Sequence, residues 1–175
     1  MIVGAVIANR HLNKKALMTN KKTKCAEAQM LIRKPVEEVF EAFMNPAITK
    51  NFWFTKSSGR LEVDKKITWT WEVYNVSTTV IAREILRDQK ILFEWDNPSR
   101  IVEFNFKELD EESTYVTVSE SGYNKKGDEL IAAIRDSTGG FTTVLDGLKA
   151  FLEHRINLNL IADKFPKEVV QHGHN

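Results

Sequence analysis

The chain has 175 residues, 42% hydrophobic and 28% charged, and this length and composition predict one globular domain with a substantial core. Its 25 lysine and arginine residues nearly balance 24 acidic residues, so it lacks the basic field on which non-specific nucleic-acid binding depends. The single cysteine, Cys25, cannot form an internal disulfide and lies outside any metal-ligand spacing, which favours a reducing compartment. We therefore expect a cytoplasmic protein that does not bind nucleic acid.

The two ends of the chain differ from the rest. An apolar run at residues 2–8 is too short to cross a bilayer, which takes about 20 residues, and no basic segment precedes it as in a secretory signal. We expect residues 1–23 to form a disordered or extended leader without a membrane role, and either Met1 or Met18 to be the natural start. Residues 24–166 are expected to form the domain, and residues 167–175 a flexible tail.

A strand and two helices are predicted first. Residues 26–33 alternate apolar and polar side chains, the period of a half-buried strand. From Val36 to Phe43 apolar side chains recur at helical spacing, with Pro35 at a favoured first-turn position. This helix should end at Asn45, and residues 46–54 should form a second short helix that leads into a loop at residues 57–59.

Residues 59–121 have the texture of an antiparallel meander. Turn signals occur at residues 63–65, 75, 88–89, 97–98 and 110–112, between segments rich in β-branched and aromatic residues. Alternation along the strands gives one strongly aromatic face. That face is expected to carry Trp69, Trp71 and Val73, then Ile91, Phe93 and Trp95, then Val102, Phe104 and Phe106, and last Val116, Val118 and Glu120.

A helical period returns after residue 129. One apolar stripe is expected, formed by Ile131, Ile134, Thr138, Phe141, Leu145, Leu148 and Leu152, and it would cover the aromatic face of the sheet. Glycine in a helix interior costs about 1 kcal/mol relative to alanine, so Gly139-Gly140 predicts a kink, a helix start or a close backbone approach. Residues 163–166 should close the helical region. The order of elements predicts an α+β fold.

Three segments in this order carry a family resemblance: "IRKPVEEVFEAFMNPAITKNFWF", "VTVSESGY" and "GGFTTVLDGLKAFLEHRINLNLIADKFP". Over residues 24–166 the chain resembles the AHSA-type branch of the START-like (SRPBCC) superfamily, named for homology to an activator of heat-shock protein 90 ATPase. The resemblance implies a helix-grip fold, in which a curved antiparallel sheet of six to seven strands wraps a long C-terminal helix. It also implies a deep, mainly hydrophobic cavity between the sheet and that helix.

Several positions match the family by alignment of these segments. Trp53 and Phe54 match an aromatic pair after the second helix, residues 122–123 match a Gly-aromatic pair, and residues 140–141 match a Gly-Trp pair that opens the last helix. The chain departs from the family at residues 63–66, where many relatives have a Gly-Gly turn. It also has Phe141 in place of tryptophan, which removes an indole N–H donor.

Chemistry-bearing residues are scarce. The sequence has no nucleophile elbow, phosphate-binding loop or zinc-protease motif, and its histidines, His11, His154, His172 and His174, form no ligand set. We expect no metal and no cofactor. Glu120 is the one charged residue predicted on the aromatic face. It is either a strand-end carboxylate that reaches solvent or caps a loop donor, or a polar anchor that aligns a ligand hydroxyl or accepts a proton.

The preferred hypothesis is non-catalytic binding of a small hydrophobic or aromatic ligand, a lipid or polyphenol-like molecule. The candidate wall consists of Trp53, Phe54, Trp69, Trp71, Phe93, Trp95, Phe104, Phe106, Glu120, Phe141, Leu145 and Leu148. The same side chains could instead fill a solid core. The resemblance offers two alternatives: a chaperone-interaction module in a stress response, and an enzyme similar to polyketide cyclases or aromatases. A monomer or weak homodimer is expected.

Overall fold

The structure is a computed structural model that describes residues 24–95 and 97–166. The predicted leader and tail lie outside these residues. The elements in chain order are β1 (Ala26–Ile32), α2 (Val36–Met44), α3 (Pro46–Thr49), β2 (Lys56–Ser57), β3 (Lys66–Trp71), the 3₁₀ turn η1 (Glu72–Tyr74), β4 (Val76–Leu86), β5 (Lys90–Trp95), β6 (Asn97–Asp110), β7 (Ser113–Ser121), α4 (Gly127–His154) and α5 (Leu160–Lys164).

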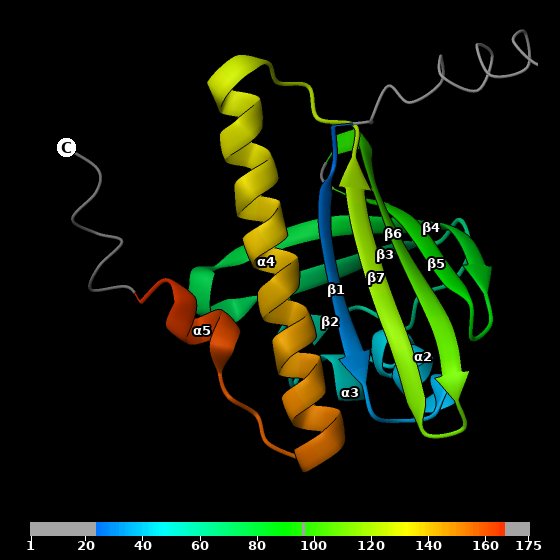
Figure 1. The fold of residues 1–175 in the computed structure, drawn as a ribbon. Coiled ribbons are helices and arrows are strands. Elements are labelled where there is room, and N and C mark those ends of the chain that lie inside the picture. Colours follow the sequence, from blue (N-terminus) through cyan, green and yellow to red (C-terminus); the bar gives the residue numbers. More distant parts are fainter. Residues whose placement is uncertain (1–23, 96, 167–175) are drawn as a thin grey trace, which may run out of the picture.

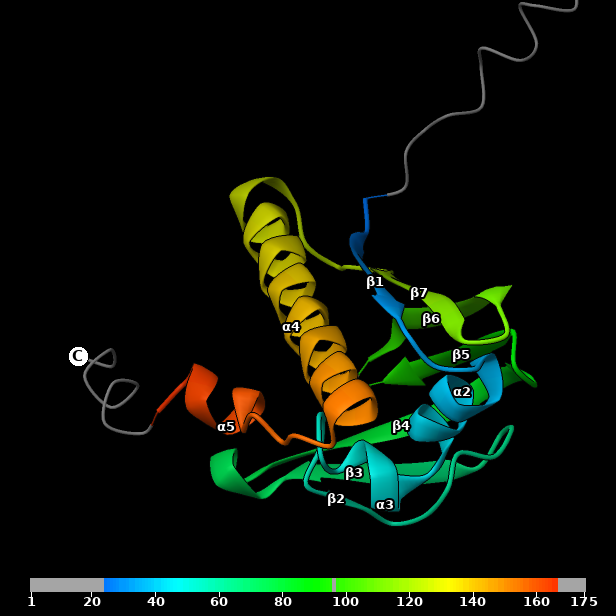
Figure 2. The same ribbon diagram turned by 60° about the horizontal axis from the view of Figure 1, so that its bottom comes forward.

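One sheet organises the molecule. Its seven strands are ordered β1-β7-β6-β5-β4-β3-β2, and every neighbouring pair is antiparallel. The sheet curves around α4, which lies across its concave side, while α2 and α3 pack near one end (Figures 1 and 2). The prediction of an α+β helix-grip fold is confirmed.

The helix α2 forms where its spacing predicts, whereas α3 begins at Pro46 as predicted but ends at Thr49 instead of residue 54. Pro35 precedes α2, and Glu37 and Glu38 lie in its first turn, where they favour the positive end of the helix dipole. The side chain of Asn45 then accepts a hydrogen bond from the Ala47 backbone N–H at 3.0 Å and caps α3. The chain after α3 enters the core with three consecutive buried aromatic residues, Phe52 to Phe54.

The aromatic face of the sheet is buried as predicted, with differences at two strand ends. Val73 lies in η1 rather than on the face, because the strand ends at Trp71 and Asn75 adopts a left-handed conformation with φ 52°. The turn predicted at residues 97–98 falls inside β6. Trp95 is paired with Asn97, so the chain reverses before that point.

The helix α4 differs most from its prediction. It runs unbroken through Gly139 and Gly140, so a helix start at Gly140 is wrong; the helix begins at Gly127. Its apolar stripe begins at buried Leu130, whereas Ile131, the next residue, lies on another face of the same turn and is 63% exposed. Arg155, in a left-handed conformation, ends α4 before the short helix α5.

Candidate functional site

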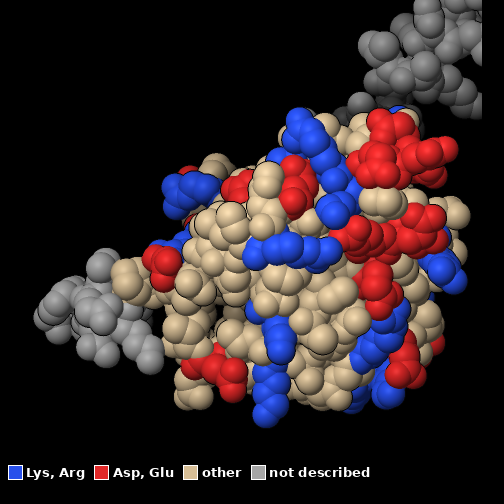
Figure 3. Space-filling model, turned by 90° about the horizontal axis from the view of Figure 1, so that it is seen from below, with Lys and Arg blue, Asp and Glu red and all other residues tan. Residues whose placement is uncertain are grey.

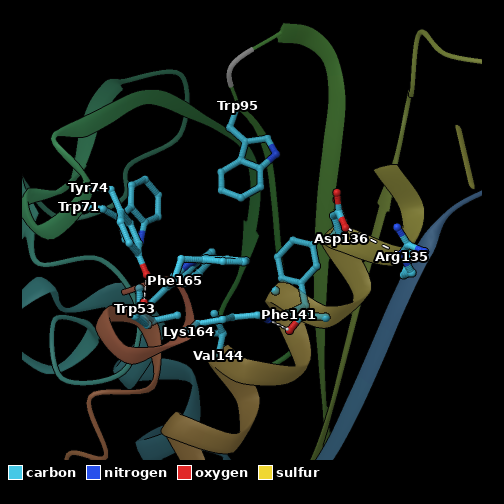
Figure 4. A pocket seen from close by; sticks show the side chains of 14 residues that line it. Trp53, Trp71, Tyr74, Trp95, Arg135, Asp136, Phe141, Val144, Lys164 and Phe165 are labelled. Atoms are coloured by element: carbon cyan, nitrogen blue, oxygen red, sulfur yellow. Dashed lines mark hydrogen bonds and ion pairs between the residues drawn. The ribbon is translucent and has the colours of Figure 1, made fainter. Parts of the chain in front are cut away.

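A pocket of about 570 Å³ opens between the sheet, α4 and α5 (Figure 4). Aromatic rings from strand ends, from the segment after α3 and from α4 surround it, and Arg135 and Asp136 of α4 lie to one side (Figure 4). Its lining consists of Trp53, Trp71, Tyr74, Trp95, Arg135, Asp136, Ser137, Gly139, Gly140, Phe141, Val144, Ile161, Lys164 and Phe165. A concave, mainly apolar site of this volume suits a small organic molecule.

Two tryptophans reach the pocket from the ends of strands. Trp71 is the last residue of β3, and Trp95 is the last residue of β5, where the register with β6 shifts between Glu94 and Trp95. Such irregularities re-aim a side chain at the rim of a sheet. The Trp95 indole stacks on Phe141 of α4, with ring centroids 6.1 Å apart and planes at 27°. Residues of the sheet and of α4 therefore form this wall of the pocket together.

Trp53 separates the pocket from the core. Its backbone N–H donates to the Thr49 carbonyl at 3.0 Å, which fixes the segment after α3 beneath the sheet. The indole is only 6% exposed and lies 4.9 Å from the Trp69 ring on one side and 6.3 Å from the Phe141 ring on the other. Trp53 thus forms the floor of the pocket and part of the core.

The predicted wall residues fall into two groups. Trp53, Trp71, Trp95 and Phe141 line the pocket. The rest lie in the buried interior away from the pocket lining: Phe54, Trp69, Phe93, Phe104, Phe106, Glu120, Leu145 and Leu148. Phe106, for example, packs edge-on against Phe40 of α2 at 5.3 Å. The aromatic face is solid core toward α2 and pocket wall at the opposite strand ends.

Glu120 is fully buried, and its carboxylate is occupied by neighbours rather than directed into the pocket. It accepts hydrogen bonds from Trp95 Nε1 at 2.7 Å and from the hydroxyl of Tyr123 at 2.7 Å, in the loop after β7. It also forms an ion pair with Arg100, whose Nη2 lies 2.6 Å away. The carboxylate therefore receives a loop donor and holds the indole of Trp95 in the pocket wall.

The electrostatics agree with an ionised Glu120. Burial raises its pKa, but hydrogen bonds from Arg100, Ser137, Trp95 and Tyr123 outweigh burial and hold the pKa below its usual value. Burial, together with the adjacent carboxylate, raises the pKa of Tyr123 to about 12, so the phenol keeps its proton. Both groups are fixed in the protonation states that their hydrogen bond requires.

The helix α5 closes one side of the pocket. The hydroxyl of Tyr74 donates to the carbonyl of Ile161, and Lys164 Nζ donates to the Gly139 carbonyl at 2.6 Å and to Thr143 Oγ1 at 2.8 Å. Phe165 also contacts the ring of Tyr74, with centroids 6.4 Å apart. The segment from α5 to Phe165 is tied to both η1 and α4, and we call it the lid.

Neither the lid nor the charged residues of the pocket were predicted as site residues from the sequence. Tyr74 lies in a turn, and Ile161, Lys164 and Phe165 lie where the helical region was expected to close. The adjacent glycines Gly139 and Gly140 were the sequence feature that could have indicated the pocket. Gly140 has no atom within 4 Å of the position that a Cβ would occupy, so it leaves room for the pocket beside α4.

Other classes of site find little support in the described residues. No group of three metal-ligating side chains occurs in ranges 24–95 and 97–166. Among the same residues, no helix has the length and apolar character to span a bilayer. Acidic and basic side chains are interspersed over the face shown in Figure 3. The aromatic pocket is the best-formed candidate site.

Comparison with solved structures supports the fold. The protein SSP2350 from Staphylococcus saprophyticus is similar at 28% identity, with a TM-score of 0.67 over 77% of this chain and 95% of that one. DynU16, a protein of the dynemicin biosynthetic locus, shares 17% identity and a TM-score of 0.68 over 77% of this chain and 49% of its own. The Aha1 dimer from Colwellia psychrerythraea shares 14% identity and a TM-score of 0.64, covering 74% and 96%.

Sequence comparison identifies the family. No curated protein matches the chain. The family model described as activator of Hsp90 ATPase homolog 1-like protein matches residues 33–153, which include the strands β2 to β7, α2, α3 and nearly all of α4. The lid lies beyond the matched residues. The chain therefore belongs to the Hsp90 ATPase activator homolog 1-like family, with the START-like fold that its sequence predicted.

Proposed function

We propose that the protein binds a small hydrophobic or aromatic molecule, lipid-like or polyphenol-like, in the pocket between sheet and α4, without transforming it. The observation that carries this proposal is the pocket of about 570 Å³ with Trp71, Trp95 and Phe141 in its wall. Planar aromatic walls favour ligands that can stack or pack edge-on. The lid would enclose such a ligand from the side opposite the strands.

The placement of Glu120 supports binding rather than catalysis. A general acid or base must lie within hydrogen-bond reach of the reacting proton. Glu120 is instead ionised, and its oxygens accept from Trp95, Arg100 and Tyr123. Among the residues that the structure describes, Glu120 is the fully buried carboxylate of the sheet, and it serves to position a wall residue.

A titration with a neutral apolar probe, N-phenyl-1-naphthylamine, tests the proposal. Three tryptophans line the pocket, so binding should quench tryptophan emission and enhance probe emission. Gly140→Leu should fill the pocket and weaken probe binding at least tenfold, because its side chain would enter open space. Gly140→Ala is the matched control and should retain most of the affinity. Equal binding by wild type and Gly140→Leu, or no saturable binding, would refute the proposal.

Contact with a chaperone is the second candidate, because the family description names an activator of Hsp90 ATPase. It is tested by the turnover of the chaperone ATPase with increasing amounts of this protein. Unchanged turnover at saturation would count against it. Analytical ultracentrifugation of the same sample would show whether the chain forms a dimer, as the Colwellia psychrerythraea relative does.

A further inference from the structure

Three charged residues line the pocket, and their charges are not balanced. Arg135 and Asp136 are adjacent in the chain, lie 4.0 Å apart, and are both largely exposed. Lys164 is also exposed, but it differs in its partners. Within the part of the chain that the structure describes, its ammonium forms no ion pair, and its contacts are the Gly139 carbonyl and Thr143 Oγ1. The pocket therefore has a net positive charge that originates from Lys164.

The contacts of Lys164 fix the ammonium without neutralising it. A lysine ammonium has three N–H donors, and two of them are used by uncharged acceptors. The side chain runs from α5 across the pocket toward α4, below Phe141 (Figure 4). One donor remains for a partner. A positive charge held beside aromatic walls is best compensated by an anionic acceptor, because charge-assisted hydrogen bonds are about twice as strong as neutral ones.

We propose that the ligand is an amphipathic organic acid, whose carboxylate or equivalent anionic oxygen group binds Lys164 Nζ. This inference depends on the function proposed above and specifies its ligand class. The apolar body of the ligand packs against Trp71, Trp95 and Phe141, and the anionic group lies at the lid. Because Lys164 also bonds to α4, an acidic ligand joins the lid to the helix and closes the pocket more firmly than a neutral ligand does.

Two probes with the same ring system test the charge: 2-naphthoate and the neutral alcohol 2-naphthalenemethanol. In wild-type protein at low ionic strength, the acid should bind about tenfold more tightly than the alcohol, the effect expected of one hydrogen bond to a charged group. Lys164→Met keeps most of the aliphatic stem but removes the ammonium, so it should lower the affinity for the acid more than the affinity for the alcohol and abolish this preference. Lys164→Arg should retain the preference, and added salt should reduce it.

Arg135→Met is the matched control, since it removes a positive charge from the same rim but leaves Lys164 in place. It should keep the preference for the acid. Preference lost in Arg135→Met and kept in Lys164→Met would overturn the inference. An equal loss of affinity for both probes in Lys164→Met would also overturn the inference, because Lys164 would then only hold the lid.

The two proposals fail in different ways. Equal wild-type affinity for acid and alcohol would refute the acidic ligand and leave the apolar pocket intact as a binding site. Absence of saturable binding by either probe would refute both proposals. Thermal unfolding of each variant, monitored by circular dichroism, checks that a lost preference does not reflect lost folding.

Discussion

At the scale of single residues, Glu120 connects the buried sheet to the pocket. Burial of a carboxylate is costly, and it is tolerated here because Arg100, Trp95 and Tyr123 supply donors. Removal of one partner from a buried ion pair is more destabilising than exchange of both partners for apolar residues. The carboxylate therefore stabilises β7 and holds the indole of Trp95 in one orientation.

Glu120→Gln should lower the free energy of unfolding by about 3 kcal/mol, because it leaves the half-buried guanidinium of Arg100 without its anionic partner. Urea denaturation measures the loss, and near-ultraviolet circular dichroism should report a change around Trp95. Glu94→Gln is the control. Glu94 pairs with Arg83 on the outer face, and the change should cost less than about 1 kcal/mol. Equal losses in both variants would contradict this assignment.

Two carboxylates, Glu120 and Glu153, predict how stability depends on pH. Glu153 of α4 accepts hydrogen bonds from the Arg33 backbone N–H and from Lys149 Nζ. Hydrogen bonds outweigh burial and hold the pKa values of Glu120 and Glu153 below the ordinary value of 4.5. In the acid range the unfolded chain therefore binds more protons than the folded chain, and stability rises with pH. This stabilisation should be fully present above about pH 5 and be lost as the pH falls through the lowered pKa values of the folded state. Urea midpoints from pH 7 to 3 measure it, and Glu120→Gln should flatten the curve.

At the scale of elements, α4 meets the rest of the protein differently along its length. At Gly147 a Cβ would lie 3.1 Å from the Cβ of Phe52 and 3.3 Å from its carbonyl oxygen, so helix and buried loop approach closely. At Gly140, two turns earlier, the same position is open. Gly147 permits close packing of α4 against Phe52, and Gly140 leaves space for the pocket.

A matched pair of substitutions separates these roles. Gly140→Ala should raise the free energy of unfolding by about 1 kcal/mol, because alanine favours the helix and meets no neighbour. Gly147→Ala should lower it by about 1 kcal/mol, because crowding against Phe52 exceeds the same helical gain. Chemical denaturation of the two variants measures both. Stabilisation by Gly147→Ala would show that the Phe52 segment moves aside easily.

The lid is held mainly by side-chain contacts with distant segments. Tyr74→Phe removes the hydrogen bond to the Ile161 carbonyl, which is expected to contribute about 1 kcal/mol. Amide hydrogens of residues 160–164 should then exchange roughly fivefold faster, as mass spectrometry of peptides would show. Tyr115→Phe, on the outer face of β7, is the control and should leave this exchange unchanged. An unchanged rate in Tyr74→Phe would mean that this hydrogen bond does not hold the lid.

The elements were predictable to the extent that local periodicity determines them. The alternation that placed Phe93 and Phe104 inward, and the spacing of α2, are local patterns, and the structure confirms both. A helix start at Gly139-Gly140, one of the predicted alternatives, was wrong because packed apolar residues on both sides of Gly140 outweigh the cost of glycine. The lid was missed because its contacts join residues such as Tyr74 and Ile161, which are far apart in sequence.

At the scale of the whole molecule, one aromatic face serves two purposes. Near α2 it forms a solid core, in which Phe43 lies 4.6 Å from Phe104. At the opposite strand ends α4 continues past the core, and the aromatic side chains there are covered by the lid instead of by a packed layer. Composition and alternation cannot separate these regions, because the division depends on the curvature of the sheet and on the register shift at Trp95. The packed core can therefore stabilise the protein while the pocket remains open.

This division predicts that a ligand stabilises the entire fold through linkage. A ligand at one hundred times its dissociation constant adds about 2.7 kcal/mol to the free energy of unfolding. For a domain of this size that corresponds to about 5–10 °C in Tm. Wild type with N-phenyl-1-naphthylamine should show this shift by calorimetry. Gly140→Leu should start from a Tm at or above that of wild type and gain at most about half of this shift, because leucine occupies the ligand space and weakens probe binding at least tenfold. An equal shift in both proteins would place the probe outside the pocket.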